Sequence, residues 1–191
     1  MSRPKAFNVV TYNIHKGLSQ FNKRLVLHEI RDRLKSLDAD VAFLQEVQGK
    51  HEANSRRHVT WPEIGQHDFL TREGCHNVYG MNAVYQDGHH GNAVVSRHPI
   101  PAWENIDVSH HPMESRGLLH CEVQIEGWKE PLHCINVHLG LWARSRRFQR
   151  REVFGAGAQQ ADSIAVNKIA HSLTMVEVNA AWSEMRAQAW P

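Results

Sequence analysis

The chain has 191 residues, 41% of them hydrophobic and 22% charged, with a net charge of +2 when its 15 histidines are counted as neutral. These values are typical of one globular domain and permit a phosphate-bearing partner without requiring one. Three cysteines without a repeated spacing argue against a disulfide framework. The sequence shows neither a signal-peptide apolar core nor an apolar stretch of membrane-spanning length. We therefore expect a cytoplasmic location, and we expect the protein to be a monomer.

The first predicted elements form a strand–helix–strand unit. Val9–Asn13 is a short β-branched run that ends in a polar residue. Leucine and isoleucine then recur at spacings of three and four, which predicts an amphipathic helix over 27–37. Val41–Glu46 is a second apolar run that ends in a polar residue. The order predicts that the two strands are neighbours.

The middle of the chain changes to a β pattern. Residues 49–80 are polar and without clear period, which predicts a long surface excursion with one short helix. A hairpin follows, with strands over 82–86 and 92–96 joined across the loop Asp87–Gly91, in which His89 and His90 are interpreted as polar loop residues. Three further strands are predicted over 102–108, 118–125 and 132–137.

The last of these strands leads directly into His138, so three predicted strands end in an amide, a carboxylate and an imidazole: Asn13, Glu46 and His138. One βα unit followed by antiparallel β predicts a mixed α/β sandwich. Strand ends are where such proteins collect ligands, and these side chains suit a metal-assisted site for phosphate esters.

The end of the chain has a different composition. Arginines cluster directly after His138, and they fit either a solvated helix face or a phosphate-facing surface. Two weakly helical stretches follow, over 164–175 and 178–190, with no predicted strand of comparable quality. The clustered arginines are Arg144, Arg146, Arg147, Arg150 and Arg151.

Four stretches occur in order along the chain: Thr11–Gly17, Phe43–Val47, Gly91–Ile100 and Ile135–Gly140, with Ser115-Arg116-Gly117 as a further familiar element. Together they resemble the endonuclease/exonuclease/phosphatase superfamily, the DNase I-like metal-dependent phosphoesterases. The resemblance implies a DNase I-like four-layer α/β sandwich, with two packed mixed β-sheets and outer helices.

This resemblance divides the chain in two. Residues 1–151 are expected to form the family-like part of the domain, and 152–191 an atypical helical or disordered tail of the same domain. The fold is therefore expected to be incomplete at its C-terminal end. We interpret the tail as read out of frame or after a deletion.

The resemblance also implies roles for individual residues. Glu46 is expected to bind Mg²⁺ or Mn²⁺, with Asn13 as a second contact to the metal. Asn13 and His138 are expected to be catalytic residues that contact the scissile phosphate. The partner is expected to be a phosphate ester: a nucleic acid, a phospholipid head group or a small ester. The residues expected to contact the rest of the substrate are Asn92, Arg116, Arg144 and Arg147.

Two family motifs are absent from this sequence. The family follows its histidine strand with an Asp-x-Asn element and ends with an Asp-His pair, whereas the aspartate after Asp107 is Asp162 in Ala-Asp-Ser and the histidine after His138 is His171 in Ala-His-Ser. Because catalytic groups that act as a unit fail together, impaired hydrolysis is expected. A non-catalytic member that binds metal or phosphate ester is the alternative.

A histidine-rich metal-binding module is a second alternative. His120-Cys121 and His133-Cys134 occur in the same Leu-His-Cys setting on two neighbouring predicted strands. The closely spaced ligand pairs usual for zinc are absent. Neighbouring residues of a strand point to opposite faces, so each strand offers one of its two side chains to a shared site.

Overall fold

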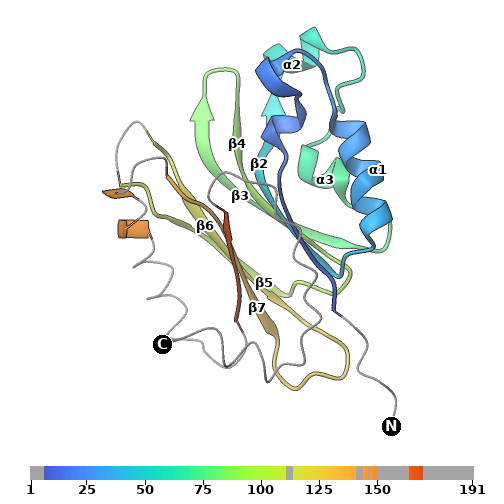
Figure 1. Cartoon of the computed structure of the whole chain (residues 1–191), viewed down its shortest axis with the longest axis vertical. Helices are drawn as coiled ribbons and strands as arrows, with labels where there is room; N and C mark the ends of the chain where they lie inside the picture. Colours follow the sequence, from blue (N-terminus) through green and yellow to red (C-terminus); the bar gives the residue numbers. More distant parts are fainter. Residues whose placement is uncertain (1–6, 111–113, 141–143, 146, 150–163, 170–191) are drawn as a thin grey trace.

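The computed structural model describes residues 7–110, 114–140, 144–145, 147–149 and 164–169. Its strands form two four-stranded sheets packed face to face (Figure 1). The orders are β1-β2-β4-β3 and β5-β6-β7-β8, and each sheet combines one parallel pair of strands with antiparallel pairs. The predicted sandwich of two mixed sheets is confirmed. Within the described part of the chain, no helix is long and apolar enough to cross a bilayer.

The first sheet carries its helices on its outer face, as Figure 1 shows for α1 and α3. The predicted neighbours β1 and β2 pair in parallel across the connection made by α1. The bounds are β1 Val9–Asn13, β2 Val41–His51, β3 His76–Tyr85 and β4 Gly88–Ser96, with helices α1 Leu27–Leu37, α2 Glu52–Arg57 and α3 Gln66–Leu70, and 3₁₀ turns His15–Gly17 and Gln20–Asn22.

The β3–β4 hairpin is confirmed but is longer than predicted. Tyr85 pairs with Gly88 across the turn residues Gln86 and Asp87, so His89 and His90 belong to β4 and not to a loop. The Asp-Gly signal locates the turn correctly. The two histidines were misplaced because their cross-strand partners, which an isolated segment does not reveal, extend the ladder.

The second sheet contains a strand that the sequence did not predict. β8 lies beside β7 in parallel, where a helix was predicted over 164–175. Weak helix propensity yields here to pairing with the open edge of β7, whose backbone groups need partners. Residues 170–175 and the helix predicted over 178–190 lie outside the described residues. The bounds are β5 Ala102–Asp107, β6 Gly117–Val123, β7 Leu132–His138 and β8 Ile164–Ile169.

Three apolar clusters hold the described part of the fold together. One lies between the sheets and contains Phe43 and Val94 from the first sheet against Leu119 from the second. Another lies under α1, where Leu27 and Ile30 pack on the outer face of the first sheet. The third belongs to the second sheet. Burial of this kind stabilises by about 1.5–3 kcal/mol per large side chain.

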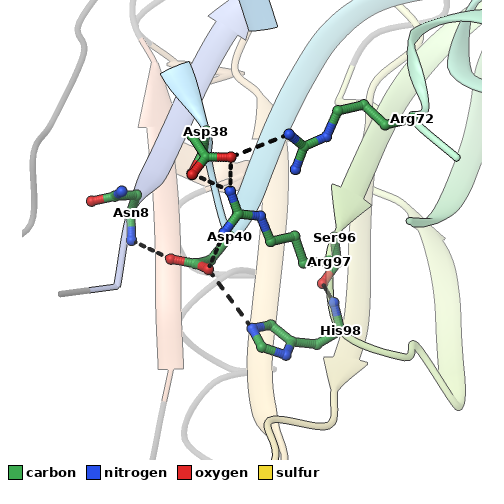
Figure 2. A network of polar contacts seen from close by, with 7 residues as sticks. All are labelled: Asn8, Asp38, Asp40, Arg72, Ser96, Arg97 and His98. Atoms are coloured by element: carbon green, nitrogen blue, oxygen red, sulfur yellow. Dashed lines mark hydrogen bonds and ion pairs between the residues drawn. The ribbon is translucent and has the colours of Figure 1, made fainter. Parts of the chain in front are cut away.

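Charged pairs fix the start of β2 against its neighbours (Figure 2). Asp38 is the left-handed C-cap of α1 and forms ion pairs with Arg72 and Arg97. Asp40 accepts a hydrogen bond from the Asn8 backbone at 2.7 Å and pairs with Arg97 at 3.4 Å. The hydrogen bonds from the arginines lower the pKa of Asp38. These contacts hold one end of β1, β2 and β4, and the predicted site residues lie further along these strands.

Candidate active site

Glu46 projects from a bulge within β2. Leu44 pairs with Ala93 and Val47 with Gly91, so two residues of β2 lie opposite the single residue between them on β4. Glu46 has a φ of 52°, in the left-handed region that non-glycine residues rarely adopt. A bulge bends its strand and redirects a side chain. The prediction that the strand ends at Glu46 is therefore wrong: β2 continues to His51, and the bulge presents the carboxylate.

The bulge brings together the three residues predicted at strand ends. Asn13 Nδ2 donates to Glu46 Oε1 at 2.9 Å, and His138 Nε2 lies 4.0 Å from the same oxygen. His15 Nδ1 lies 3.5 Å from Glu46 Oε2. Asn13 and His138 do end their strands, as predicted. The Glu46 side chain is 18% exposed, which leaves it open to a ligand.

The surroundings of Glu46 favour its charged form. Burial acts to raise the pKa of this carboxyl, but the hydrogen bond from Asn13 and the proximity of His138 outweigh it. Lys16 and His15 act in the same direction, and the pKa lies below its ordinary value. The site therefore holds a carboxylate at neutral pH, surrounded by groups that attract anions.

A small polar pocket opens beside this carboxylate, between the two sheets. Both sheets contribute to it, and it includes three of the predicted site residues besides Glu46: Asn92, Arg116 and His138. Within the described residues, every lining side chain is polar or glycine. The lining is Glu46, Asn82, His90, Gly91, Asn92, Ser115, Arg116 and His138.

The predicted substrate contacts in this pocket are already engaged with the protein. Asn92 Nδ2 donates to the Gly117 carbonyl at 3.0 Å, which ties β4 to β6. Arg116 Nη2 donates to Glu114 at 3.1 Å, and its Nε is buried without a hydrogen-bond partner. Both side chains line the pocket, so their predicted contact with substrate stays a prediction.

The structure does not bring Arg144 and Arg147 into the site. Both belong to the helical residues that follow β7, and both are exposed. Neither is among the described residues that line the pocket. Their predicted contact with more distant parts of a substrate remains untested.

A buried amide pair supports the bulge from behind. Asn136 of β7 donates to the Leu44 carbonyl at 2.9 Å and to the Ala93 carbonyl at 2.8 Å. Its side-chain oxygen accepts from Gln45 Nε2 at 2.8 Å. Both amides are fully buried. Asn136 thus links the second sheet to both strands that form the bulge, and it fixes the backbone beside Glu46.

Sequence reasoning missed His90, which lies in the pocket. Burial lowers the pKa of His90 to about 4, and Lys16 adds to this lowering. The ring is therefore neutral at physiological pH. The strand-like alternation on either side of the turn was the available signal. A two-residue turn at this point would place His90 on a strand.

His90 is expected to make stability depend on pH. Its pKa is about 4 when folded, against an ordinary value of 6.5, so the unfolded chain takes up the proton first. Stability is therefore lost as pH falls below the unfolded value, by about 2 kcal/mol between pH 7 and 5. Urea unfolding at both pH values measures this loss. His90→Gln should remove it, whereas His76→Gln, at an exposed histidine, should not. Equal pH dependence of wild type and His90→Gln contradicts the assignment.

The donors around Glu46 fit a hard divalent cation. Mg²⁺ is usually held by one or two carboxylates together with water and substrate phosphate, and Glu46 supplies one carboxylate. The amide oxygen of Asn13 is a second hard donor, which here accepts the His15 backbone N–H at 3.0 Å. No group of three or more histidine, cysteine or acidic side chains suited to a metal occurs in the described ranges. The donor set thus fits an ion completed by water and phosphate.

The histidines and cysteines of the zinc alternative lie on different faces of the second sheet. His120 and His133 contact each other at 3.0 Å on one face of the second sheet, and His120 contacts Glu104 at 3.1 Å. Cys121 and Cys134 are free, buried thiols and belong to the layer between the sheets. The alternation of side chains thus separates histidines from cysteines, as predicted.

Comparison with known proteins decides the family. The model of the Endonuclease/Exonuclease/phosphatase family matches residues 10–166, which is most of the chain. The chain belongs to this family. The protein YbhP of Escherichia coli K12 is 43% identical over 145 residues, and the match covers 75% of this chain and 57% of YbhP. YbhP of Shigella flexneri matches equally well. The chain thus spans somewhat more than half the length of these relatives.

Solved structures of family members share the fold. An endonuclease/exonuclease/phosphatase from Beutenbergia cavernae aligns with a TM-score of 0.62 and 19% identity, over 83% of this chain and 45% of that one. TDP2 of D. rerio, in complex with a single-strand DNA product, aligns with a TM-score of 0.58 and 19% identity, over 85% and 59% of the two chains. The DNase I-like architecture predicted from the sequence is confirmed.

Proposed function

We propose that this family member is a Mg²⁺- or Mn²⁺-dependent phosphoesterase whose turnover is impaired. The observation that carries the proposal is the contact of Glu46 with Asn13 and His138 beside a polar pocket. A phosphate ester is the substrate class that suits a carboxylate surrounded by cationic and amide groups. A cytoplasmic location and a monomeric state stay predictions.

Each residue of the site has a role in this proposal. Glu46 and the amide oxygen of Asn13 would hold the cation, which when bound supplies Lewis-acid polarisation of the phosphoryl oxygen. His138, which lines the same pocket, would donate a hydrogen bond to the phosphate. Arg116 adds positive charge at the pocket wall, where it attracts the anionic ester.

The proposal of impaired turnover is supported by the acidic groups of the described part of the site and by the sequence after His138. Among the described lining residues, Glu46 is the one carboxylate, so a second acidic group that could deprotonate the attacking water is not in place. The sequence after His138 has no Asp-x-Asn and no Asp-His pair. General acid–base assistance contributes about 10²–10⁴-fold to such reactions.

A second candidate function is binding of metal and phosphate ester without hydrolysis. The same single carboxylate favours it, because a site can retain its affinity when its general base is missing.

Hydrolysis assays separate the two candidates. The substrates are bis-p-nitrophenyl phosphate and nicked plasmid DNA, each with Mg²⁺, with Mn²⁺ or with EDTA. Turnover that requires either metal and stops in EDTA supports the phosphoesterase. No turnover with any metal eliminates it and leaves the binding function. Turnover that persists in EDTA contradicts both, since neither candidate hydrolyses esters without a metal.

A further inference from the structure

Two aromatic rings stack at the edge of the pocket. Tyr85, the last residue of β3, lies against His90 with ring centroids 5.4 Å apart and an angle of 24° between the planes. The tyrosine is 51% exposed, whereas the histidine is buried and lines the pocket. The tyrosine of this pair therefore meets solvent, while the histidine belongs to the site.

The hairpin fixes this pair in place. Tyr85 pairs with Gly88 across the turn, and His90 pairs with Ala83, so the two rings are diagonal neighbours on adjacent strands. Gly88 lets the hairpin turn pack closely on β2, because a Cβ there would lie 2.0 Å from the Lys50 carbonyl oxygen. The position of Tyr85 is thus set by the sheet and does not depend on a loop.

Tyr85 also lies near the charges of the site. Burial raises the pKa of its hydroxyl, and the charges of Arg116 and Glu46 act on that pKa in opposite directions. His90 lines the same pocket as Glu46 and Arg116, so the ring of Tyr85 that stacks on it borders the place where a phosphate would lie.

We propose that Tyr85, supported by His90, selects phosphate esters that carry a nucleobase, which stacks on the exposed tyrosine face. The proposal rests on the phosphate site proposed above and names its substrate class. Aromatic side chains bind nucleic acid bases by stacking without strong sequence preference. A lipid chain fits less well, because none of the described lining residues is apolar apart from glycine.

Two esters with the same leaving group test the proposal. Thymidine 5′-(p-nitrophenyl phosphate) carries a base on the retained side, and methyl p-nitrophenyl phosphate does not. In Tyr85→Ala, the ratio of kcat/KM for the thymidine ester to that for the methyl ester should fall about tenfold. Tyr85→Phe keeps the ring and should keep the ratio. Val84→Ala, at the exposed neighbouring residue of β3, is the matched control and should also keep it.

Three results overturn the proposal: an unchanged ratio in Tyr85→Ala, an equal loss in Tyr85→Phe, or an equal loss in the Val84→Ala control. A binding measurement tests the stacking surface even if the protein does not hydrolyse esters. If wild type shows no turnover, titration calorimetry with thymidine 5′-monophosphate and with methyl phosphate replaces the assay. Tighter binding of the nucleotide that Tyr85→Ala abolishes supports the stacking surface, even in an inactive chain. Equal affinities, no binding of either compound, or an unaffected preference overturns it.

Discussion

Replacing Glu46 with glutamine is expected to lower metal-dependent hydrolysis of bis-p-nitrophenyl phosphate by about 10³-fold, since metal-assisted charge stabilisation contributes several kcal/mol. Glutamine retains the size of the side chain but lacks the charge that holds the cation. The variant also keeps an oxygen that can accept from Asn13, so the bulge should persist. Initial rates at saturating Mn²⁺ measure the effect.

A matched carboxylate elsewhere in the molecule provides the control. Glu104 of β5 is exposed and lies outside the pocket. Like Glu46 it contacts a histidine side chain, which in its case is His120. Glu104→Gln should leave the rate within about twofold of wild type, as is usual for an exposed residue away from a site. Retained turnover in Glu46→Gln, or equal losses in both variants, would remove Glu46 from the proposed mechanism.

The variant Asn136→Leu is expected to lower the free energy of unfolding by about 2–4 kcal/mol. Leucine has a similar size but makes no hydrogen bond, so the Leu44 and Ala93 carbonyls and the Gln45 amide lose their buried partner. Each unsatisfied buried group costs about 1–3 kcal/mol. Urea unfolding monitored by tryptophan fluorescence measures the change.

A second asparagine provides the control. It shows whether the loss of stability comes from this link between the sheets or from the removal of any asparagine side chain. Asn77 of β3 makes one exposed hydrogen bond, to Asp68 at 3.2 Å. Asn77→Leu should change stability by less than about 0.5 kcal/mol. If Asn136→Leu is as stable as Asn77→Leu, the amide pair does not hold the two sheets together at the bulge.

Much of the fold follows from local sequence patterns. The β-branched runs, the amphipathic periodicity of α1 and the Asp-Gly turn locate most strands and the first helix correctly. The parallel pairing of β1 and β2 also follows, because a strand–helix–strand unit of this length leaves few arrangements.

The elements that were predicted incorrectly depend on distant partners. β8 forms because the edge of β7 offers it a ladder, and its own residues carry only a weak local preference. The extension of β2 past Glu46 likewise depends on β4, because Val47 pairs with Gly91 and His51 with Gly88. The local sequence of one segment does not indicate which distant strand it pairs with.

The candidate site was predicted in outline. The polar residues Asn13, Glu46 and His138 do meet, although Glu46 reaches the site through a bulge and not through a strand end. His90 and the buried role of Asn136 were not predicted, because a pocket wall and a link between sheets exist only once two sheets are packed together. The sequence also could not exclude Arg144 from the pocket wall.

The location of bound Mn²⁺ tests the central claim most directly. Paramagnetic Mn²⁺ broadens NMR signals near it, so substoichiometric addition to the ¹⁵N-labelled chain maps the binding site. We predict selective loss of the backbone signals of Asn13, Glu46 and His138. In the Glu46→Gln variant, Mn²⁺ should leave the signals of Asn13 and His138 in place. Broadening centred on His120 and His133, or no selective broadening at any Mn²⁺ concentration, would contradict a metal site at Glu46.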